Sequence, residues 1–521
     1  MRVKSSLLNI TAGLGNQIII AGLSFLTRTV FIHILGIEYL GINALFTSIL
    51  AMLAIAESGI GSSIIYSLYK PVAKDDRPRI IALMNLYRKA YWIIAAVILL
   101  IGLALMPFLH LFVKDTSVDH LHMIYLIFLM HTALPYLFVY KHSFLNVNQK
   151  NYVITLGFTI SAVLSTGIRL AILHYTENYI LYLIAEAAIS LATSYILARL
   201  VDRKYPFLNE GTNYKLDDAT KAQFIKNMKA ILLQNIGNYF IFGVDSVLIS
   251  SFISVVAVGL YSNYKLLIEL CRNFSNQIFS NLYHSIGNLV AQESREKVYS
   301  IFQVSMLVNF LLYAFLAIML YLFVEPLIKV WIGNQFVMDK WVLLLLVITF
   351  YERGMRNTIT TIKTTSGIFH EDRFAPVIQA AINLSISILF VYTMGIVGIF
   401  LGTLISSLLV PFWFIPYLVY KNVFQRSLLI YFAKYGYYTG IALMTAFLVN
   451  MVLHLLALPD DSFLWLIVKA VVAAVSINLI FICMFYRSEE FKYLFNIAKT
   501  MLGKLVSLKS ASKKNVVSDQ S

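Results

Sequence analysis

The chain contains a long series of apolar runs, and their length limits what it can fold into. Fourteen runs of about 20 residues recur along its 521 residues, and a helix of about 20 residues spans a hydrocarbon core of roughly 30 Å. Each run predicts a membrane-spanning helix, because a helix satisfies its backbone polar groups without water. The predicted spans start near Thr11, Ile37, Lys89, Leu121, Tyr152, Tyr179, Lys229, Ile253, Ser300, Trp341, Pro376, Gly395, Tyr431 and Ser462.

Composition excludes the soluble classes of protein. Apolar residues make up 59% of the chain and charged residues 13%, whereas soluble domains have about 45–50% and 25%. So few charged groups cannot cover the surface of a soluble protein of this size. We therefore expect an all-α polytopic membrane protein, and neither a cytosolic enzyme nor a secreted disulfide scaffold.

The basic residues set the predicted orientation. Of the 41 Lys and Arg residues, 31 fall in loops and tails on one side, three on the other side and seven within the spans. Loops rich in Lys and Arg stay in the cytoplasm. Both termini and the central loop are therefore expected to be cytoplasmic, in a protein of the cytoplasmic membrane. The formal net charge of +15 follows from this topology, and nucleic acid is not an expected partner.

An internal repeat appears when the chain is aligned with itself so that Gly41 falls on Gly259. The same alignment places PVAKDDRPRI on LVAQESREKV, and with it Arg77 on Arg295. An even number of predicted spans separates the two copies. The two halves are therefore expected to have the same orientation, about an axis normal to the membrane.

This repeat predicts a division of the chain into five parts. Two pseudo-symmetric six-helix lobes occupy residues 1–201 and 230–421, and a cytoplasmic linker over 202–229 joins them. An extra pair of helices follows at 422–487, and a basic cytoplasmic tail at 488–521. Both the linker and the tail are expected to contact lipid headgroups.

Twelve charged residues lie inside the predicted spans. Each costs about 2.5–3.5 kcal/mol near the centre of a spanning helix, so each must pair, reach the interface or line a polar cavity. The basic residues are Arg28, Arg169, Lys265, Arg272, Arg353, Arg356 and Lys469. The acidic residues are Glu57, Glu186, Asp245, Glu269 and Glu352.

Helical spacing groups several of these charges on common faces. One face of the eighth span carries Ser262, Lys265, Glu269, Arg272 and Asn276. In the seventh span a face carries Gln234, Asn238 and Asp245, and the tenth span carries Glu352, Arg353, Arg356 and Asn357. The stripes predict one water-filled cavity between the lobes.

Two interpretations of these charges stay open. Lys265 with Glu269, and Glu352 with Arg356, fit neutral pairs within one helix, and Glu186 fits a pair with Arg169. The functional interpretation is that the cavity binds phosphate, which arginine binds bidentately. Its predicted substrate-binding residues are Arg28, Lys265, Arg272, Arg353, Arg356 and Asn276. Its ion-coupling candidates are Glu57, Asp245 and Glu269, since buried carboxylates have tunable pKa values.

Catalytic motifs are missing from the sequence. There is no HExxH, no P-loop and no GxSxG motif, each of which would indicate a specific chemistry. We therefore expect a protein that is not an enzyme and has no cofactor or metal, with coupling to a Na⁺ or H⁺ gradient.

The segment LTRTVFIHILGIEYLGINALFTSILAMLAIAESGIGSSIIYSLYKPVAKDD resembles the opening of the Wzx-type polysaccharide flippases. These belong to the multidrug/oligosaccharidyl-lipid/polysaccharide exporter superfamily. Arg28 matches the arginine of the family's first span, and Glu57 matches its acidic position in the second span. The resemblance implies alternating access that moves an undecaprenyl-pyrophosphate-linked oligosaccharide to the outer leaflet, for capsule, exopolysaccharide or other cell-envelope polysaccharide. The span count also resembles the lipid II flippase branch.

Other functions compete with this interpretation. The alternative is a cation-coupled small-molecule or multidrug exporter on the same fold, but sites for organic cations favour acidic linings, and here basic charges outnumber acidic ones. A membrane polymerase or ligase would need a large outer loop. The expected partners are the lipid-linked oligosaccharide, membrane lipids, a polysaccharide polymerase and glycosyltransferases.

Overall fold

The computed structural model is helical, and no strand occurs among the residues that it describes. Those residues are 2–57, 60–114, 116–210, 214, 222, 239, 243–368, 371–459, 462–496 and 499. The chain forms two compact units. Unit 1 comprises Met1–Asn263 and Pro376–Thr403, and unit 2 comprises Tyr264–Ala375 and Leu404–Ser521.

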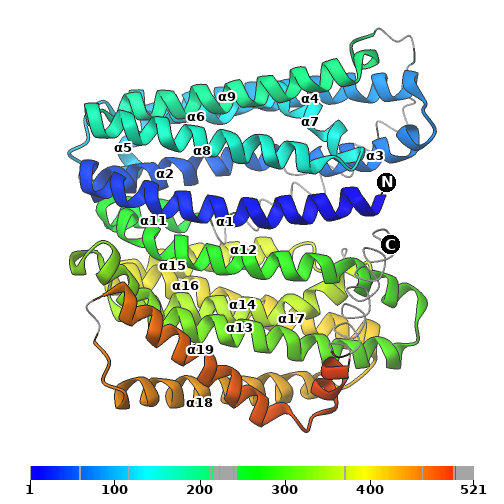
Figure 1. Cartoon of the computed structure of the whole chain (residues 1–521), viewed down its shortest axis with the longest axis vertical. Coiled ribbons are helices and arrows are strands. Elements are labelled where there is room, and N and C mark those ends of the chain that lie inside the picture. Colours follow the sequence, from blue (N-terminus) through cyan, green and yellow to red (C-terminus); the bar gives the residue numbers. More distant parts are fainter. Residues whose placement is uncertain are drawn as a thin grey trace, which may run out of the picture. The chain divides into compact units, whose positions relative to one another are not determined.

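Unit 1 contains the N-terminal helices and several elements from later in the chain (Figure 1). Its long helices are α1 (Arg2–Leu35), α2 (Ile37–Leu53), α3 (Ile60–Ala73), α4 (Arg77–Leu105), α6 (Leu121–Ala133), α7 (Tyr136–Val147), α8 (Asn151–Thr176) and α9 (Tyr179–Lys204). Short pieces are η1 (Ala54–Glu57), η2 (Met106–Phe108), α5 (Leu109–Phe112) and η3 (Pro206–Asn209). The later elements are α11 (Asp245–Phe252), the beginning of α12 (Val255–Gln292), α15 (Ala375–Met394) and the first half of α16 (Ile396–Leu409).

Unit 2 is built around α13 (Arg295–Trp331), which packs against α14 (Lys340–Thr365) and α19 (Phe463–Phe485). It also contains most of α12 (Val255–Gln292), η4 (Asn334–Phe336), α17 (Pro411–Val419), η5 (Tyr420–Phe424) and α18 (Leu428–Leu455).

The predicted extra pair corresponds to α18 and α19, which pack on each other and on α13. Phe310 of α13 stacks on Tyr438 with ring centroids 4.6 Å apart, and it also meets Phe481 of α19.

The predicted class of polytopic helical membrane protein is confirmed. Ten helices of the described chain are long and apolar enough to cross a membrane, and the shorter α2 is also apolar. The predicted count of fourteen is not confirmed, because most of the seventh span and the linker lies outside the described residues. The helices α12 and α14 are long but carry the charged stripes, and they are not among the ten.

The two copies of the repeat have the same local structure. Asp76 caps α4 by accepting a hydrogen bond from the backbone N–H of Arg79 at 3.3 Å. Ser294 caps α13 by accepting from the backbone N–H of Lys297 at 3.5 Å. The repeat alignment places Asp76 on Ser294 and Arg79 on Lys297, so the aligned strings end one helix and begin the next at equivalent positions.

The helices α2 and α12 cross at the repeat-related glycines. A Cβ on Gly41 would overlap the carbonyl oxygen of Val255, and a Cβ on Gly259 would overlap the carbonyl oxygen of Ile37. The repeat alignment also places Ile37 on Val255, so the crossing itself is symmetric. Only glycine allows backbones to approach this closely.

The compact units do not follow the predicted lobes. The elements α11 and α15 and the beginning of α12 belong to unit 1, although they fall in the predicted second lobe at 230–421. The lobe boundaries taken from the repeat stay a prediction.

We expect Gly41→Ala to destabilise the protein by about 1–3 kcal/mol, as overpacking does in well-packed cores. The new methyl group meets a backbone atom of Val255, which cannot rotate away. Thermal unfolding of the purified protein measures the effect. Gly440→Ala in α18 is the control, because no heavy atom lies within 4 Å of its added Cβ. Equal unfolding temperatures for both variants would contradict the crossing.

Candidate functional site

Arg28 lies in α1, where its guanidinium faces α12. Its Nη1 atom donates to the hydroxyl oxygen of Ser262 at 3.1 Å and to the amide oxygen of Asn263 at 2.9 Å. Both partners are uncharged, and among the described residues no carboxylate forms an ion pair with Arg28. The side chain therefore keeps its full positive charge within unit 1.

Asp245 begins α11 and is buried with polar groups of α15 and α16. The hydroxyl of Thr403 donates to the Asp245 carboxylate at 3.4 Å, and the amide nitrogen of Asn383 donates to the Thr403 hydroxyl at 2.9 Å. The Asn383 amide oxygen is buried and has no hydrogen-bond partner among the described residues. The cluster thus combines one carboxylate with neutral oxygen atoms.

Glu57 ends η1, where the predicted second span is interrupted between α2 and α3. The Tyr136 hydroxyl donates to the Glu57 carboxylate at 2.7 Å, and the Tyr91 hydroxyl also hydrogen-bonds to it. Within the described ranges no Lys or Arg forms an ion pair with Glu57. Two stacked tyrosine rings therefore hold a carboxylate that no Lys or Arg of the described chain neutralises.

The predicted stripe of the eighth span lies along α12. Glu269 and Arg272 form an ion pair at 2.5 Å, and Asn276, one turn further on, is exposed. Lys265 is partly buried. The carboxylate of Glu269 thus neutralises Arg272.

Glu352 and Arg356 form a buried pair within α14, and the prediction of such a pair is confirmed. Arg356 Nε and Nη2 both donate to the Glu352 carboxylate, the second at 3.0 Å. Ser407 accepts from Arg356 Nη2 at 2.8 Å and donates to Glu352 at 2.7 Å. This closed network satisfies both charges. Arg353, on the same helix, is partly buried.

The pairing of Arg169 with Glu186 is also confirmed, at 2.5 Å between α8 and α9. Arg169 Nη1 also donates to the hydroxyl oxygen of Tyr182 at 3.1 Å. This pair holds two helices of unit 1 together and leaves no excess charge.

The predicted site residues are divided between the units. Unit 1 contains Arg28, Glu57 and Asp245, and unit 2 contains Lys265, Glu269, Arg272, Asn276, Arg353 and Arg356. A single cavity lined by all of them stays a prediction. Gln234 and Asn238, which are predicted to share a face with Asp245, lie outside the described residues.

Sequence reasoning missed the uncharged partners. Asn263, Thr403 and Ser407 contact the charged groups, and Asn383 contacts Thr403, but the predicted site rested on the charges within spans. The signal that could have found them is the occurrence of Asn, Ser and Thr inside apolar runs, because such residues also need hydrogen-bond partners in a membrane.

The described helices and their internal polar contacts define a polytopic membrane protein with charges placed inside its bundle. Its sequence matches the family model for polysaccharide biosynthesis proteins over residues 6–283, more than half of the chain. The chain therefore belongs to the polysaccharide biosynthesis protein family, and the resemblance seen in the sequence is confirmed. A comparison with curated protein sequences finds no match.

Solved structures share the fold. The lipid II flippase MurJ, in an inward closed conformation, matches with a TM-score of 0.66 and 15% identity over 93% of this chain and 99% of that chain. A multidrug resistance MATE transporter of the MOP superfamily matches with a TM-score of 0.60 and 13% identity, over 77% of this chain and 95% of that chain. A variant of the Vibrio cholerae MATE transporter VcmN matches with a TM-score of 0.56 and 16% identity, over 82% of this chain and 99% of that chain. At these identities the likeness establishes the fold.

We expect Arg356→Met to destabilise the protein by about 3–5 kcal/mol, because it leaves the buried Glu352 carboxylate without its cation. The double variant Glu352→Gln/Arg356→Met removes both charges and should recover most of that loss. Thermal unfolding in detergent measures both. If the double variant is no more stable than Arg356→Met, the unpaired Glu352 carboxylate is not the cause of the lost stability.

Proposed function

We propose that this protein flips an undecaprenyl-pyrophosphate-linked oligosaccharide from the cytoplasmic to the outer leaflet of the cytoplasmic membrane. Membership of the polysaccharide biosynthesis protein family supports this proposal, as does a fold shared with the lipid II flippase MurJ. The polymer would be a capsule, an exopolysaccharide or another envelope polysaccharide, and both termini would face the cytoplasm.

The single observation that carries the proposal is the charge of Arg28. A charge in a spanning helix costs about 2.5–3.5 kcal/mol. In the described helices this cost is offset by a carboxylate for three other arginines, Arg169, Arg272 and Arg356. Arg28 is held by two neutral oxygens, which orient the guanidinium without neutralising it. A pyrophosphate would supply the missing negative charge through charge-assisted hydrogen bonds.

The substrate chemistry follows from this arrangement. A pyrophosphate cannot cross hydrocarbon alone, so fixed cations must replace its hydration, while the lipid tail remains in the bilayer. In this proposal Lys265, Arg272, Arg353 and Asn276 line the path of the sugar and phosphate groups, whereas Arg356 stays in its buried network with Glu352 and Ser407. Rocking of two lobes would expose the site alternately to each side.

Coupling to an ion gradient is assigned to Asp245 in this proposal. The Asp245 carboxylate accepts from the Thr403 hydroxyl, which accepts from the Asn383 amide nitrogen, and oxygen atoms of these kinds are the hard ligands that alkali cations prefer. The unsatisfied Asn383 amide oxygen favours Na⁺ over a proton, since a cation would satisfy it. The second coupling candidate is Glu57, whose partners among the described groups are tyrosine hydroxyls. The third is Glu269, which is paired with Arg272.

The multidrug exporter remains the alternative function, because MATE transporters share the fold. An organic cation would be repelled by Arg28, which carries a charge that no described carboxylate offsets. The positive charge therefore favours an anionic substrate.

Replacing Arg28 by alanine should slow the translocation of a fluorescent lipid-pyrophosphate oligosaccharide in proteoliposomes by roughly tenfold to a hundredfold, the value of lost charge-assisted hydrogen bonds. Arg28→Lys keeps the positive charge but lacks the planar guanidinium that binds phosphate bidentately, so its translocation rate should lie between those of wild type and Arg28→Ala. The double variant Arg169→Gln/Glu186→Gln is the control, because it removes a neutral pair. An Arg28→Ala protein that flips the lipid at the wild-type rate would overturn the proposal.

Replacing Asp245 by asparagine should abolish the dependence of translocation on the Na⁺ gradient, because the amide lacks the charge that attracts the cation. Rates with and without the gradient measure this. The exposed cap residue Asp339, which accepts from the Trp341 backbone N–H at 2.7 Å, gives the matched control Asp339→Asn. Unchanged gradient dependence in Asp245→Asn would exclude this carboxylate as the coupling site.

A further inference from the structure

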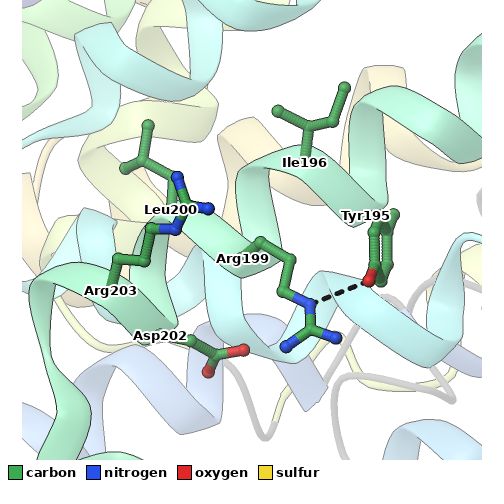
Figure 2. Close-up of a pocket in the computed structure, with 6 residues that line it drawn as sticks. All are labelled: Tyr195, Ile196, Arg199, Leu200, Asp202 and Arg203. Carbon is green, nitrogen blue, oxygen red and sulfur yellow. Dashed lines mark hydrogen bonds between the residues drawn. The ribbon is translucent and has the colours of Figure 1, made fainter.

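A pocket of about 680 Å³ lies beside the last turns of α9 in unit 1. Figure 2 shows the side chains that line it, all from this one helix: Tyr195, Ile196, Arg199, Leu200, Asp202 and Arg203. None of these residues belongs to the site proposed for transport.

The lining places the pocket at the edge of the hydrocarbon. The apolar helix α9 ends at Lys204, and Ile196 and Leu200 are 63% and 38% exposed. Tyr195 is exposed as well, at 43%. Exposed Trp and Tyr are typical of the membrane–water interface, where one end of a ligand is apolar and the other is charged.

The carboxylate of Asp202 is already occupied. Lys141 of α7 donates to both of its oxygens at 2.5 and 2.6 Å, and the Asn209 amide donates at 3.0 Å. Asp202 and Lys141 thus neutralise each other, and they fix the end of α9 against α7.

The two arginines are left with excess positive charge. Arg199 and Arg203 are one helical turn apart and both exposed. The Nε atom of Arg199 donates to the Tyr195 hydroxyl at 2.8 Å (Figure 2). The guanidinium carbon of Arg199 also lies 5.2 Å from the centroid of the Tyr195 ring. In the part of the chain that the structure describes, no carboxylate forms an ion pair with either arginine.

We propose that this pocket binds one anionic phospholipid of the surrounding leaflet. Arg199 and Arg203 hold the phosphate of the headgroup, since guanidinium groups match phosphate oxygens bidentately. The acyl chains lie along Ile196 and Leu200, and Tyr195 holds Arg199 in place. Basic pockets at the ends of spanning helices favour anionic headgroups. The inference does not rest on the proposed transport function.

Native mass spectrometry of the detergent-purified full chain tests the site, with phosphatidylglycerol as the probe and phosphatidylcholine as the zwitterionic comparison. Wild type should retain phosphatidylglycerol in preference to phosphatidylcholine. Arg199→Gln/Arg203→Gln should weaken its binding by about tenfold or more. Lys204→Gln is the matched control, because it removes a charge from the same turn without lining the pocket.

Three results would overturn the proposal. The first is equal retention of phosphatidylglycerol by wild type and the double variant. The second is equal binding of phosphatidylcholine and phosphatidylglycerol by wild type. The third is displacement of bound phosphatidylglycerol by millimolar inorganic phosphate, which would show a site for free phosphate. Unfolding temperatures of the variants, measured in parallel, show whether loss of binding reflects loss of the fold.

Discussion

The cost of placing charge in hydrocarbon governs the interior of this protein. A charged side chain on a membrane helix must find an opposite charge or a ligand that supplies one. Arg356, Arg272 and Arg169 each find a carboxylate. Arg28 instead finds two neutral oxygens, and this difference separates an arginine whose charge is already offset from one that is ready for an anion.

The crossing of α2 and α12 bears on the same arginine. Gly41 and Gly259 let the two backbones touch, and within the next turn after Gly259 come Ser262 and Asn263, which hold Arg28. The close approach and the arginine contacts therefore lie along one stretch of α12. In this way the glycines of the internal repeat position the groups that orient the charge.

Much of this could be predicted from the sequence, because composition, period and charge spacing are one-dimensional properties. The helical membrane class, the repeat that aligns Gly41 with Gly259 and the pair of Glu352 with Arg356 follow from them. The contact of Arg28 with Asn263 does not, since it joins residues 235 positions apart and an uncharged amide in an apolar run attracts no notice. The interruption of the second span at Glu57 was missed because apolar residues resume at Ile60 after the short segment Glu57, Ser58 and Gly59.

The role of Arg28 as an anion-binding charge is best measured by the affinity of the purified protein for a lipid-linked disaccharide, with the pyrophosphate lipid compared against an analogue whose linkage is uncharged. Wild type should prefer the pyrophosphate lipid by about tenfold or more, as charge-assisted hydrogen bonds provide. Arg28→Gln should lose that preference while it binds the uncharged analogue as wild type does. If Arg28→Gln kept the preference of wild type, Arg28 would not be the group that binds the pyrophosphate.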